Sequence, residues 1–107
     1  MNIDIIEDPK VKDSKYISYT IVNLDNNDEV GYIFILDNHI AYEIFPKYRR
    51  QGIATYALKY ITSKLDRPVL EIQINNIPSK KTALKAGYTF IKNEGNFDIY
   101  HYEKKKK

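Results

Sequence analysis

The residue types best suited to chemistry lie in one basic turn. The segment over residues 46–55 reads PKYRRQGIAT and contains Arg49, Arg50 and Gly52. If a helix begins at this glycine, its first turn presents unpaired backbone N–H groups and the positive end of the helix dipole. A glycine there lets a diphosphate approach the backbone, and the arginines add positive charge. The turn therefore predicts an anion site; the alternative is an ordinary connection with solvated arginines.

The residues on either side of this turn predict a strand before it and a helix after it. Residues 40–45 (IAYEIF) are β-branched and aromatic, and Pro46 should end the strand because proline cannot donate to a sheet ladder. After the turn, apolar residues recur at spacings of three and four, which predicts a helix over residues 52–65. The face of that helix is formed by Ala54, Ala57, Leu58, Ile61 and Leu65.

The remaining segments predict a sheet with a second helix. A tight connection at residues 37–39 precedes strand 40–45, and residues 1–6 are a candidate edge strand, whereas residues 7–15 show no helical pattern. A helix over residues 78–87 has proline in its first turn and glycine at its C-terminal cap. The other strands are expected over residues 16–23, 30–36, 69–74, 88–92 and 97–102. The expected order, β-β-β-α-β-α-β-β, requires a parallel crossover around the first helix and hence a mixed α/β (α+β) sheet.

Composition limits the remaining possibilities. The 107 residues are expected to form one domain over residues 1–103 and a lysine-rich tail over 104–107. The tail supplies four of the 17 basic residues, which leaves 13 against 14 acidic ones, so the net charge of +3 does not indicate nucleic-acid binding. The absence of cysteine excludes disulfides, thiolate zinc sites and a cysteine nucleophile, and no metal site is expected. Without a signal-peptide pattern or a run of about 20 apolar residues, we expect a cytoplasmic protein.

Two motifs resemble the GNAT superfamily of N-acetyltransferases. The family signature is [Q/R]-x-x-G-x-[G/A], usually preceded by V-x-P-x-[YF]; here residues 44–48 read IFPKY and are followed by Arg49, Gly52 and Ala54. Residues 76–88 (NIPSKKTALKAGY) are similar to the N-x-x-S-x-x-x-x-x-K-x-G-[FY] pattern of the subgroup that includes the N-terminal acetyltransferases of ribosomal proteins. The resemblance covers about residues 30–103.

The resemblance implies acetyl-CoA as the co-substrate and a GNAT-like sheet, mostly antiparallel, with one parallel pair of strands and about two helices. In this family the parallel strands splay apart and the pantetheine arm inserts between them. The diphosphate is then held by backbone N–H groups of the basic turn. The residues implied to contact acetyl-CoA are Ile44, Phe45, Arg49, Arg50, Gln51, Gly52, Ile53, Ala54, Thr55, Asn76 and Ser79. For Asn76, the alternative is capping of the second helix.

Direct transfer of the acetyl group, as the resemblance implies, requires a base that takes a proton from the amine. Glu43 is the first candidate, because a carboxylate within an apolar strand should be desolvated; the alternative is a rim carboxylate paired with a lysine. His39 is the second candidate, because a histidine side chain ordinarily titrates at a pKa of about 6.5, which suits a base; the alternative is an exposed turn residue. Glu71 is the third candidate, and deprotonation through water would need none of them.

The leaving thiolate requires a proton or a hydrogen-bond donor. Many family members use a tyrosine of the second helix, seven residues after the motif asparagine, and this position is Ala83 here. Ser79, at the start of the same helix, is the expected replacement. The alternative is a serine that only hydrogen-bonds a free backbone N–H at the helix start.

The function expected from these observations is transfer of an acetyl group to a primary amine of a protein, a peptide or a small molecule. The chain before its first strands is too short for the helices that usually wall the acceptor site in the family, which favours an open groove and a polypeptide acceptor. The alternative is a non-catalytic module that binds acyl-CoA or serves as an interaction domain. A homodimer is possible, and no membrane partner is expected. Nucleic-acid binding is not expected either, because the ten tyrosines fall mostly in strand or helix positions, where packing explains them.

Overall fold

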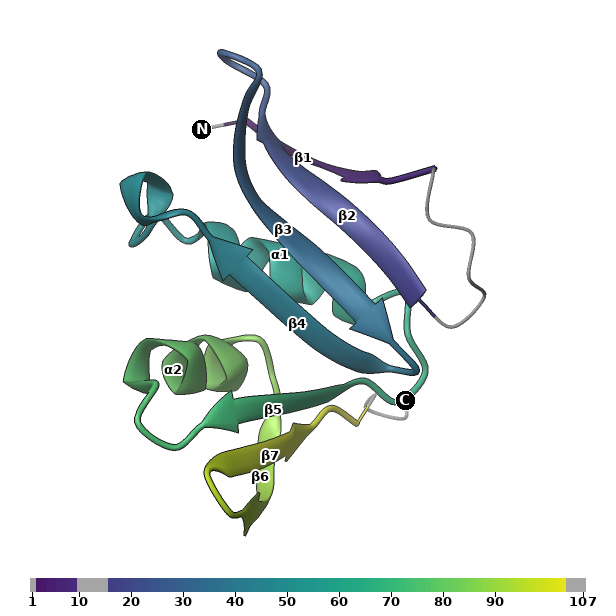
Figure 1. Ribbon diagram of the computed structural model, residues 1–107, viewed down its shortest axis with the longest axis vertical. Coiled ribbons are helices and arrows are strands. Elements are labelled where there is room, and N and C mark those ends of the chain that lie inside the picture. The colour runs from purple at the N-terminus through teal and green to yellow at the C-terminus, as the bar shows by residue number, and fades with distance from the viewer. Residues whose placement is uncertain (1, 10–15, 104–107) are drawn as a thin grey trace.

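The strands of the chain form one mixed sheet (Figure 1). The computed structural model describes residues 2–9 and 16–103. In this part of the chain the strands are β1 (Ile3–Glu7), β2 (Tyr16–Asn23), β3 (Asp28–Leu36), β4 (His39–Ile44), β5 (Val69–Gln73), β6 (Thr89–Glu94) and β7 (Phe97–His101). The helices are the 3₁₀-helix η1 (Pro46–Tyr48), α1 (Ile53–Thr62) and α2 (Ile77–Lys85).

The strand order in the sheet is β1-β2-β3-β4-β5-β7-β6. Strands β4 and β5 are parallel, and the other neighbouring pairs of the described strands are antiparallel. This confirms the predicted α/β (α+β) class, with a mostly antiparallel sheet, one parallel pair and two α-helices. The candidate edge strand at residues 1–6 is β1, which pairs with β2.

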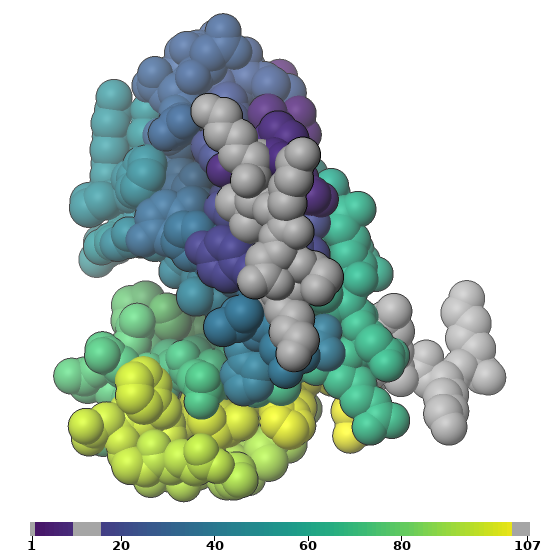
Figure 2. All heavy atoms as spheres, turned by 45° about the vertical axis from the view of Figure 1, so that its right-hand side comes forward, coloured from purple at the N-terminus to yellow at the C-terminus, as the bar shows by residue number. Residues whose placement is uncertain are grey.

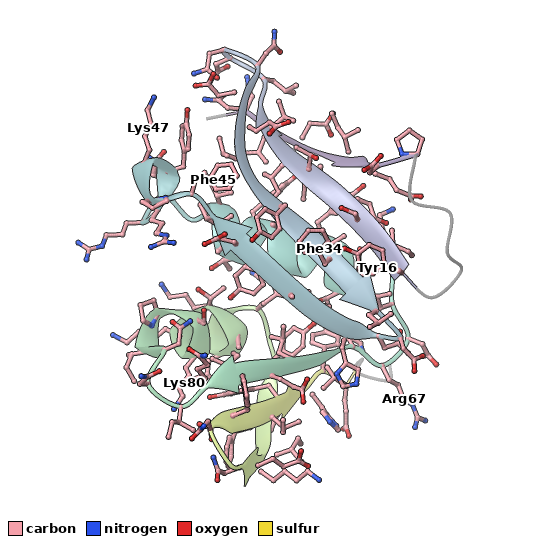
Figure 3. The ribbon with its side chains drawn as sticks, in the orientation of Figure 1. Tyr16, Phe34, Phe45, Lys47, Arg67 and Lys80 are labelled. Carbon is pink, nitrogen blue, oxygen red and sulfur yellow. The ribbon has the colours of Figure 1, made fainter. Side chains whose placement is uncertain are left out.

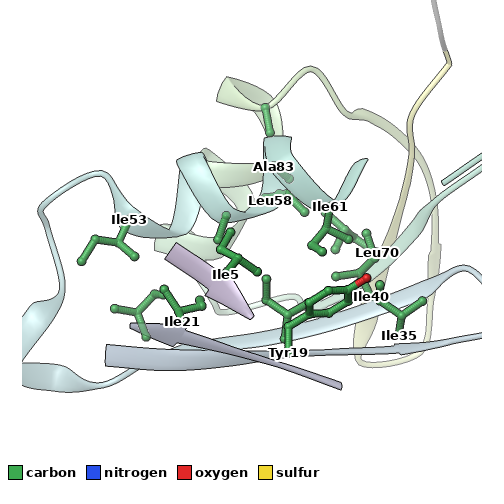
Figure 4. Packing of buried hydrophobic residues seen from close by; sticks show 14 of the residues in the cluster. Ile5, Tyr19, Ile21, Ile35, Ile40, Ile53, Leu58, Ile61, Leu70 and Ala83 are labelled. Atoms are coloured by element: carbon green, nitrogen blue, oxygen red, sulfur yellow. The ribbon is translucent and has the colours of Figure 1, made fainter. Parts of the chain in front are cut away.

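Alternation along the strands places every second side chain against the helices. Ile35 of β3 and Ile40 of β4 are buried beneath Leu58 and Ile61 of α1 (Figure 4). Ala83 of α2 belongs to the same apolar cluster, so both helices lie on one face of the sheet. The predicted apolar face of the first helix is therefore the face that the core buries.

The opposite face of the sheet carries a row of half-buried aromatic rings. Tyr16 stacks on Phe34 with 5.8 Å between ring centroids, and Phe34 lies 4.7 Å from Tyr32. Phe45, at the end of β4, extends the row at 6.1 Å from Tyr32 (Figure 3). No helix of the described residues covers this face.

Helix α1 is shorter than the predicted range of 52–65. The backbone N–H of Lys64 bonds to Ile61 and that of Leu65 to Thr62, so the last turn is tightened into i→i+3 bonds beyond the end of the α-helix. Helix α2 covers Ile77–Lys85 rather than the predicted 78–87; Gly87 follows it, and its φ of +95° allows the N–H of Tyr88 to bond back to the carbonyl of Ala83 at 2.9 Å.

Two predictions concern residues outside the described ranges: part of the non-helical segment at 7–15 and the lysine-rich tail at 104–107. Within the described residues, no helix is long and apolar enough to cross a membrane.

The parallel strands β4 and β5 separate after a short paired stretch. They are paired only at His39 with Val69 and at Ile40 with Leu70. Beyond this point β4 stays bonded to β3, and the N–H of Phe45 still donates to the carbonyl of Val30 at 2.9 Å. The edge of β4 that faces β5 is therefore open towards its C-terminal end.

Close approach of β3 to β4 at Gly31 helps to hold β4 on that side. A Cβ atom on Gly31 would lie 2.2 Å from the carbonyl oxygen of Glu43, so only glycine fits this contact. The register of β2 and β3 also shifts here, since Ile21 pairs with Gly31 and Val22 with Glu29. Such a bulge bends and twists the strand, which favours the divergence of β4 from β5.

Candidate functional site

A cleft of about 870 Å³ lies where β4 and β5 separate. Figure 2 shows a recess between the blue and teal residues of β3, β4 and the turn after them and the green residues of α2. Both faces of β4 contribute, because Glu43 points to the helix-free face and Tyr42 to the helix side. The lining residues are Tyr32, Tyr42, Glu43, Ile44, Tyr48, Arg49, Arg50, Gly52, Ile53, Ala54, Thr55, Asn76, Pro78, Ser79, Thr82 and Lys85.

One end of the cleft is formed by the start of α1. Gly52 is the N-cap residue with a φ of +78°, and its carbonyl accepts the first helical bond, from Tyr56, at 3.1 Å. The first turn of α1 contains no acidic residue, so its unpaired N–H groups and dipole are not neutralised there. A Cβ on Gly52 would meet no atom within 4 Å. Glycine is thus required here for its backbone angle, and open space lies beside it.

The two arginines of the turn are placed differently. Arg49 folds back onto β4, where its Nε donates to the carbonyl of Ile44 at 2.8 Å and its Nη2 lies 3.7 Å from Oε1 of Glu43. Arg50 is exposed at the cleft and has a positive φ of 64°, an uncommon conformation for a residue with a side chain. Of the residues expected at the cofactor site, Phe45 and Gln51 do not line the cleft.

Glu43 is held by two neighbours on the helix-free face. Its Oε2 accepts a hydrogen bond from the hydroxyl of Tyr32 at 2.7 Å, and Arg49 approaches the other oxygen. This hydrogen bond is the main cause that raises the pKa of Tyr32. The Glu43 side chain is 46% exposed, because strand alternation turns it away from the apolar core. It is therefore a fixed carboxylate at the cleft rim, paired with an arginine and a tyrosine.

His39 lies at the other end of β4. It is the first residue of the strand, because the preceding turn consists of Asp37 and Asn38, whose φ values of 50° and 69° are typical of a two-residue hairpin. Its Nδ1 is 3.4 Å from Oε2 of Glu71, and both side chains are about half exposed. Neither residue lines the cleft, so the structure brings together Glu43 and Ser79 but not His39.

The start of α2 forms the side of the cleft opposite β4. Asn76 is the N-cap, and its Oδ1 accepts a hydrogen bond from the backbone N–H of Ser79 at 3.2 Å. Because Asn76 performs this capping, the hydroxyl of Ser79 is not needed for it. One turn later, the hydroxyl of Thr82 donates to the carbonyl of Pro78 at 3.0 Å.

Tyr42 is a cleft residue that the sequence analysis missed. Its hydroxyl is buried and forms no hydrogen bond within the described part of the chain. Burial raises the pKa of Tyr42, and the neighbouring hydroxyls of Ser79 and Thr82 oppose that increase. The alternating pattern of residues 40–45 could have identified it, since it places Tyr42 on the opposite side of β4 from Glu43.

Comparison with known proteins supports the fold assignment through structure alone. No protein-family model matches the chain, and no curated protein matches its sequence. Spermidine N-acetyltransferase from Vibrio cholerae, solved in complex with CoA and spermine, superposes with a TM-score of 0.71 at 11% identity, over 84% of this chain and 65% of that protein. N-acetyltransferase PseH from Campylobacter jejuni, in complex with acetyl coenzyme A, gives 0.74 at 11% identity, over 88% and 72%. A GNAT-family acetyltransferase from Bacillus anthracis gives 0.63 at 22% identity, over 79% and 63%.

The chain has the GNAT fold. Two of these three matches cover slightly less than two thirds of the other protein. Within this GNAT fold, the cleft combines three features: an open strand edge on β4, the positive end of α1, and a carboxylate on the helix-free face. The described residues contain no group of three His, Asp or Glu side chains that could hold a metal ion.

Proposed function

We propose that this chain is an N-acetyltransferase that transfers an acetyl group from acetyl-CoA to a primary amine. The observation that carries the proposal is the continuity between the open edge of β4 and the N-terminus of α1. The N–H of Phe45 points to β3, and the carbonyl of Asn38 accepts from Val69 of β5. Since backbone groups alternate along a strand, those of Tyr42 and Ile44 face the split.

The carbonyl of Ile44 already accepts from Arg49, but the other backbone groups of this edge suit an extended arm with amide groups, which can pair with a strand edge as an added strand would. At the end of that edge, the N–H groups of Ile53, Ala54 and Thr55 are available to a diphosphate, and Arg50 adds charge. Acetyl-CoA carries both an amide-containing arm and a diphosphate, and it would supply the acetyl group as an activated thioester. The donor set present in the cleft therefore fits this co-substrate.

The helix-free face supplies the groups that would receive the amine. Glu43 reaches the cleft from this face, and Tyr32 and Arg49 fix its carboxylate. A carboxylate in this position can attract an ammonium group and accept its proton, directly or through a water molecule. Ser79 lies on the helix side, in the opposite wall of the same cleft.

The shape of the helix-free face supports a proposal for the acceptor class. Within the described residues this face is an open sheet surface with a row of aromatic rings, rather than an enclosed pocket. An open surface accommodates an extended segment, so we favour the amine of a protein or peptide over an enclosed metabolite. A small amine is the other candidate, and the Vibrio cholerae neighbour was solved with spermine.

The proposal is tested by thermal unfolding with and without acetyl-CoA, followed by an assay of labelled acetyl transfer to peptides, proteins and polyamines. We expect acetyl-CoA at 100 times its Kd to stabilise the protein by about 2.7 kcal/mol. Gly52→Asp should abolish this stabilisation, because it places a negative charge at the start of α1. Gly95→Asp is the matched control: Gly95 also has a positive φ (62°) and open surroundings, but it lies in the turn before β7.

Three outcomes separate the possibilities. The expected result is that acetyl-CoA stabilises the wild type and Gly95→Asp but not Gly52→Asp, and that the wild type acetylates an amine. Binding of acetyl-CoA without transfer to any acceptor class would instead favour a non-catalytic module. If acetyl-CoA stabilises both aspartate variants as much as the wild type, the diphosphate does not bind at this turn.

A further inference from the structure

The hydroxyl of Tyr42 is a buried polar group that lacks a regular hydrogen-bond partner in the described part of the chain. It forms no hydrogen bond of regular geometry there, although a buried hydroxyl normally has a partner; burial raises its pKa, and the hydroxyls of Ser79 and Thr82 lie close enough only to oppose that increase. Its aromatic ring packs against the core, and the residue lines the cleft. Such an unsatisfied group at the wall of a binding cleft suggests a partner that arrives with the substrate.

The position of Tyr42 along β4 indicates which part of a substrate it would meet. The open edge of β4 begins after Ile40, which is still paired with Leu70, and extends past Ile44 towards the start of α1. An arm that runs along this edge from the α1 N-terminus reaches Tyr42 just before the strands close. The end of the arm that is farthest from the diphosphate is therefore expected beside Tyr42.

The residues of α2 around Tyr42 leave its hydroxyl available as a hydrogen-bond donor on the helix side of the cleft. The hydroxyl hydrogen of Thr82 is already donated to Pro78, and Ala83 is completely buried, so a larger side chain would not fit there without displacing α2. Burial raises the pKa of Tyr42, so its hydroxyl keeps its proton at neutral pH. Ser79 lies beside it and can orient that hydroxyl.

We propose that the hydroxyl of Tyr42 donates a hydrogen bond to the thioester sulfur as it departs as a thiolate. This inference rests on the proposed function and assigns a catalytic residue to it. The transfer forms the N–C bond of the amide and breaks the C–S bond. The proton lost by the amine passes to Glu43 or to water, the thiolate takes up a proton from solvent, and Tyr42 retains its own. The hydrogen bond stabilises charge that develops only as the C–S bond breaks.

The test compares the wild type with Tyr42→Phe, and Tyr88→Phe is the matched control. Tyr88 also has a buried hydroxyl, but it is bonded to Thr62 at 2.6 Å and does not line the cleft. We expect Tyr42→Phe to lower kcat about tenfold to a thousandfold, with the KM for acetyl-CoA changed less than about threefold. Because the hydroxyl of Tyr42 has no hydrogen bond of regular geometry, Tyr42→Phe should change the Tm little, whereas Tyr88→Phe should lower it.

A second readout does not depend on turnover. The chain contains no cysteine, so the thiol of CoA is the only thiol in the sample, and with the protein in excess over CoA an alkylating reagent such as iodoacetamide reports on the bound form. The pH dependence of alkylation gives the pKa of this thiol, because the thiolate is the reactive form. The pKa should be higher by about one to two in Tyr42→Phe than in the wild type. Tyr88→Phe should not change it.

Failure of this inference is distinguishable from failure of the proposed function. If the wild type neither binds CoA nor acetylates amines, the proposed function is wrong. If it does both, and Tyr42→Phe leaves kcat and the pKa of the bound thiol unchanged, the assignment of Tyr42 is wrong. A larger loss of kcat in Ser79→Ala than in Tyr42→Phe would also overturn it, because the hydroxyl of Ser79 would then be the main donor.

Discussion

Tyr42 and Glu43 are adjacent in the sequence, yet strand alternation directs them to opposite faces of the sheet at the split between β4 and β5. Glu43 faces the helix-free side, where Tyr32 and Arg49 hold its carboxylate. Tyr42 faces α2 and the hydroxyls on it. One pair of residues thus places a carboxylate on one face of the cleft and a buried hydroxyl on the other, the two groups to which we propose to assign the proton acceptor and the hydrogen-bond donor.

Replacing Glu43 with glutamine tests the first of these roles. Glutamine keeps an oxygen that can accept from Tyr32, but it removes the negative charge. We expect Glu43→Gln to lower kcat by about a hundredfold or more, with little change in the affinity for acetyl-CoA. Steady-state kinetics and calorimetry measure the two quantities.

The matched control is Glu71→Gln, because Glu71 lies on the same face with similar exposure (48% against 46%) but outside the cleft. It should have a kcat within about twofold of the wild type. If Glu43→Gln also retains the wild-type kcat across the pH range, Glu43 is neither a base nor an electrostatic anchor for the amine.

At the scale of elements, the sequence was most informative where short-range rules apply. Pro46 ends β4, Gly52 caps α1, and Gly87 ends α2, each for a reason visible in the residue type. The length of the β4–β5 pairing could not be read in this way, because it depends on contacts between Ile40 and Leu70, which are 30 positions apart. The splayed pair was expected only from the family resemblance.

The same limit explains what the sequence missed within the site. Ten tyrosines look alike in the sequence, and most of them are explained by packing, so Tyr42 did not stand out. The pairing of His39 with Glu71 depends on the register of β4 and β5, which no local pattern reveals. Arg49 was expected to add positive charge at the anion site, and no local pattern shows that its Nε would donate to the carbonyl of Ile44 instead, which lacks a strand partner at the split.

The open edge of β4 makes a specific prediction for amide hydrogen exchange. The N–H groups of Tyr42 and Ile44 face the split, whereas those of Ala41 and Glu43 face β3. Without CoA, the first pair should exchange faster than the second. CoA at 100 times its Kd should slow the first pair by up to about a hundredfold if it pairs with this edge. NMR exchange measurements resolve the four amides, and unchanged rates for Tyr42 and Ile44 would exclude β4 as the binding edge.

At the scale of the whole molecule, few contacts hold the two sides of the split together. The paired stretch of β4 and β5 spans only His39 and Ile40 on the β4 side. On the helix side, α1 packs against α2, and the hydroxyls of Thr62 and Tyr88 share a buried hydrogen bond of 2.6 Å. This bond ties the last residue of α1 to the residue that follows the C-terminal cap of α2. The two sides of the split are therefore joined by the short pairing of β4 with β5 and, on the helix side, by this buried pair of hydroxyls.

The buried hydroxyl of Tyr88 should make the free energy of unfolding depend on pH in the alkaline range. Burial is the main cause that raises the pKa of Tyr88 to about 12, from 10.0 for an exposed tyrosine. The folded state therefore holds the proton more tightly than the unfolded state, so this contribution to stability is complete below pH 10 and is lost as the pH rises towards 12. Its full size is on the order of 2 kcal/mol.

Tyr88→Phe should be less stable than the wild type near pH 8, because Thr62 loses its partner. The difference in free energy of unfolding between the two proteins should become smaller between pH 10 and 12. Urea unfolding at several pH values measures this, and a constant gap would show that Tyr88 titrates as an exposed tyrosine does.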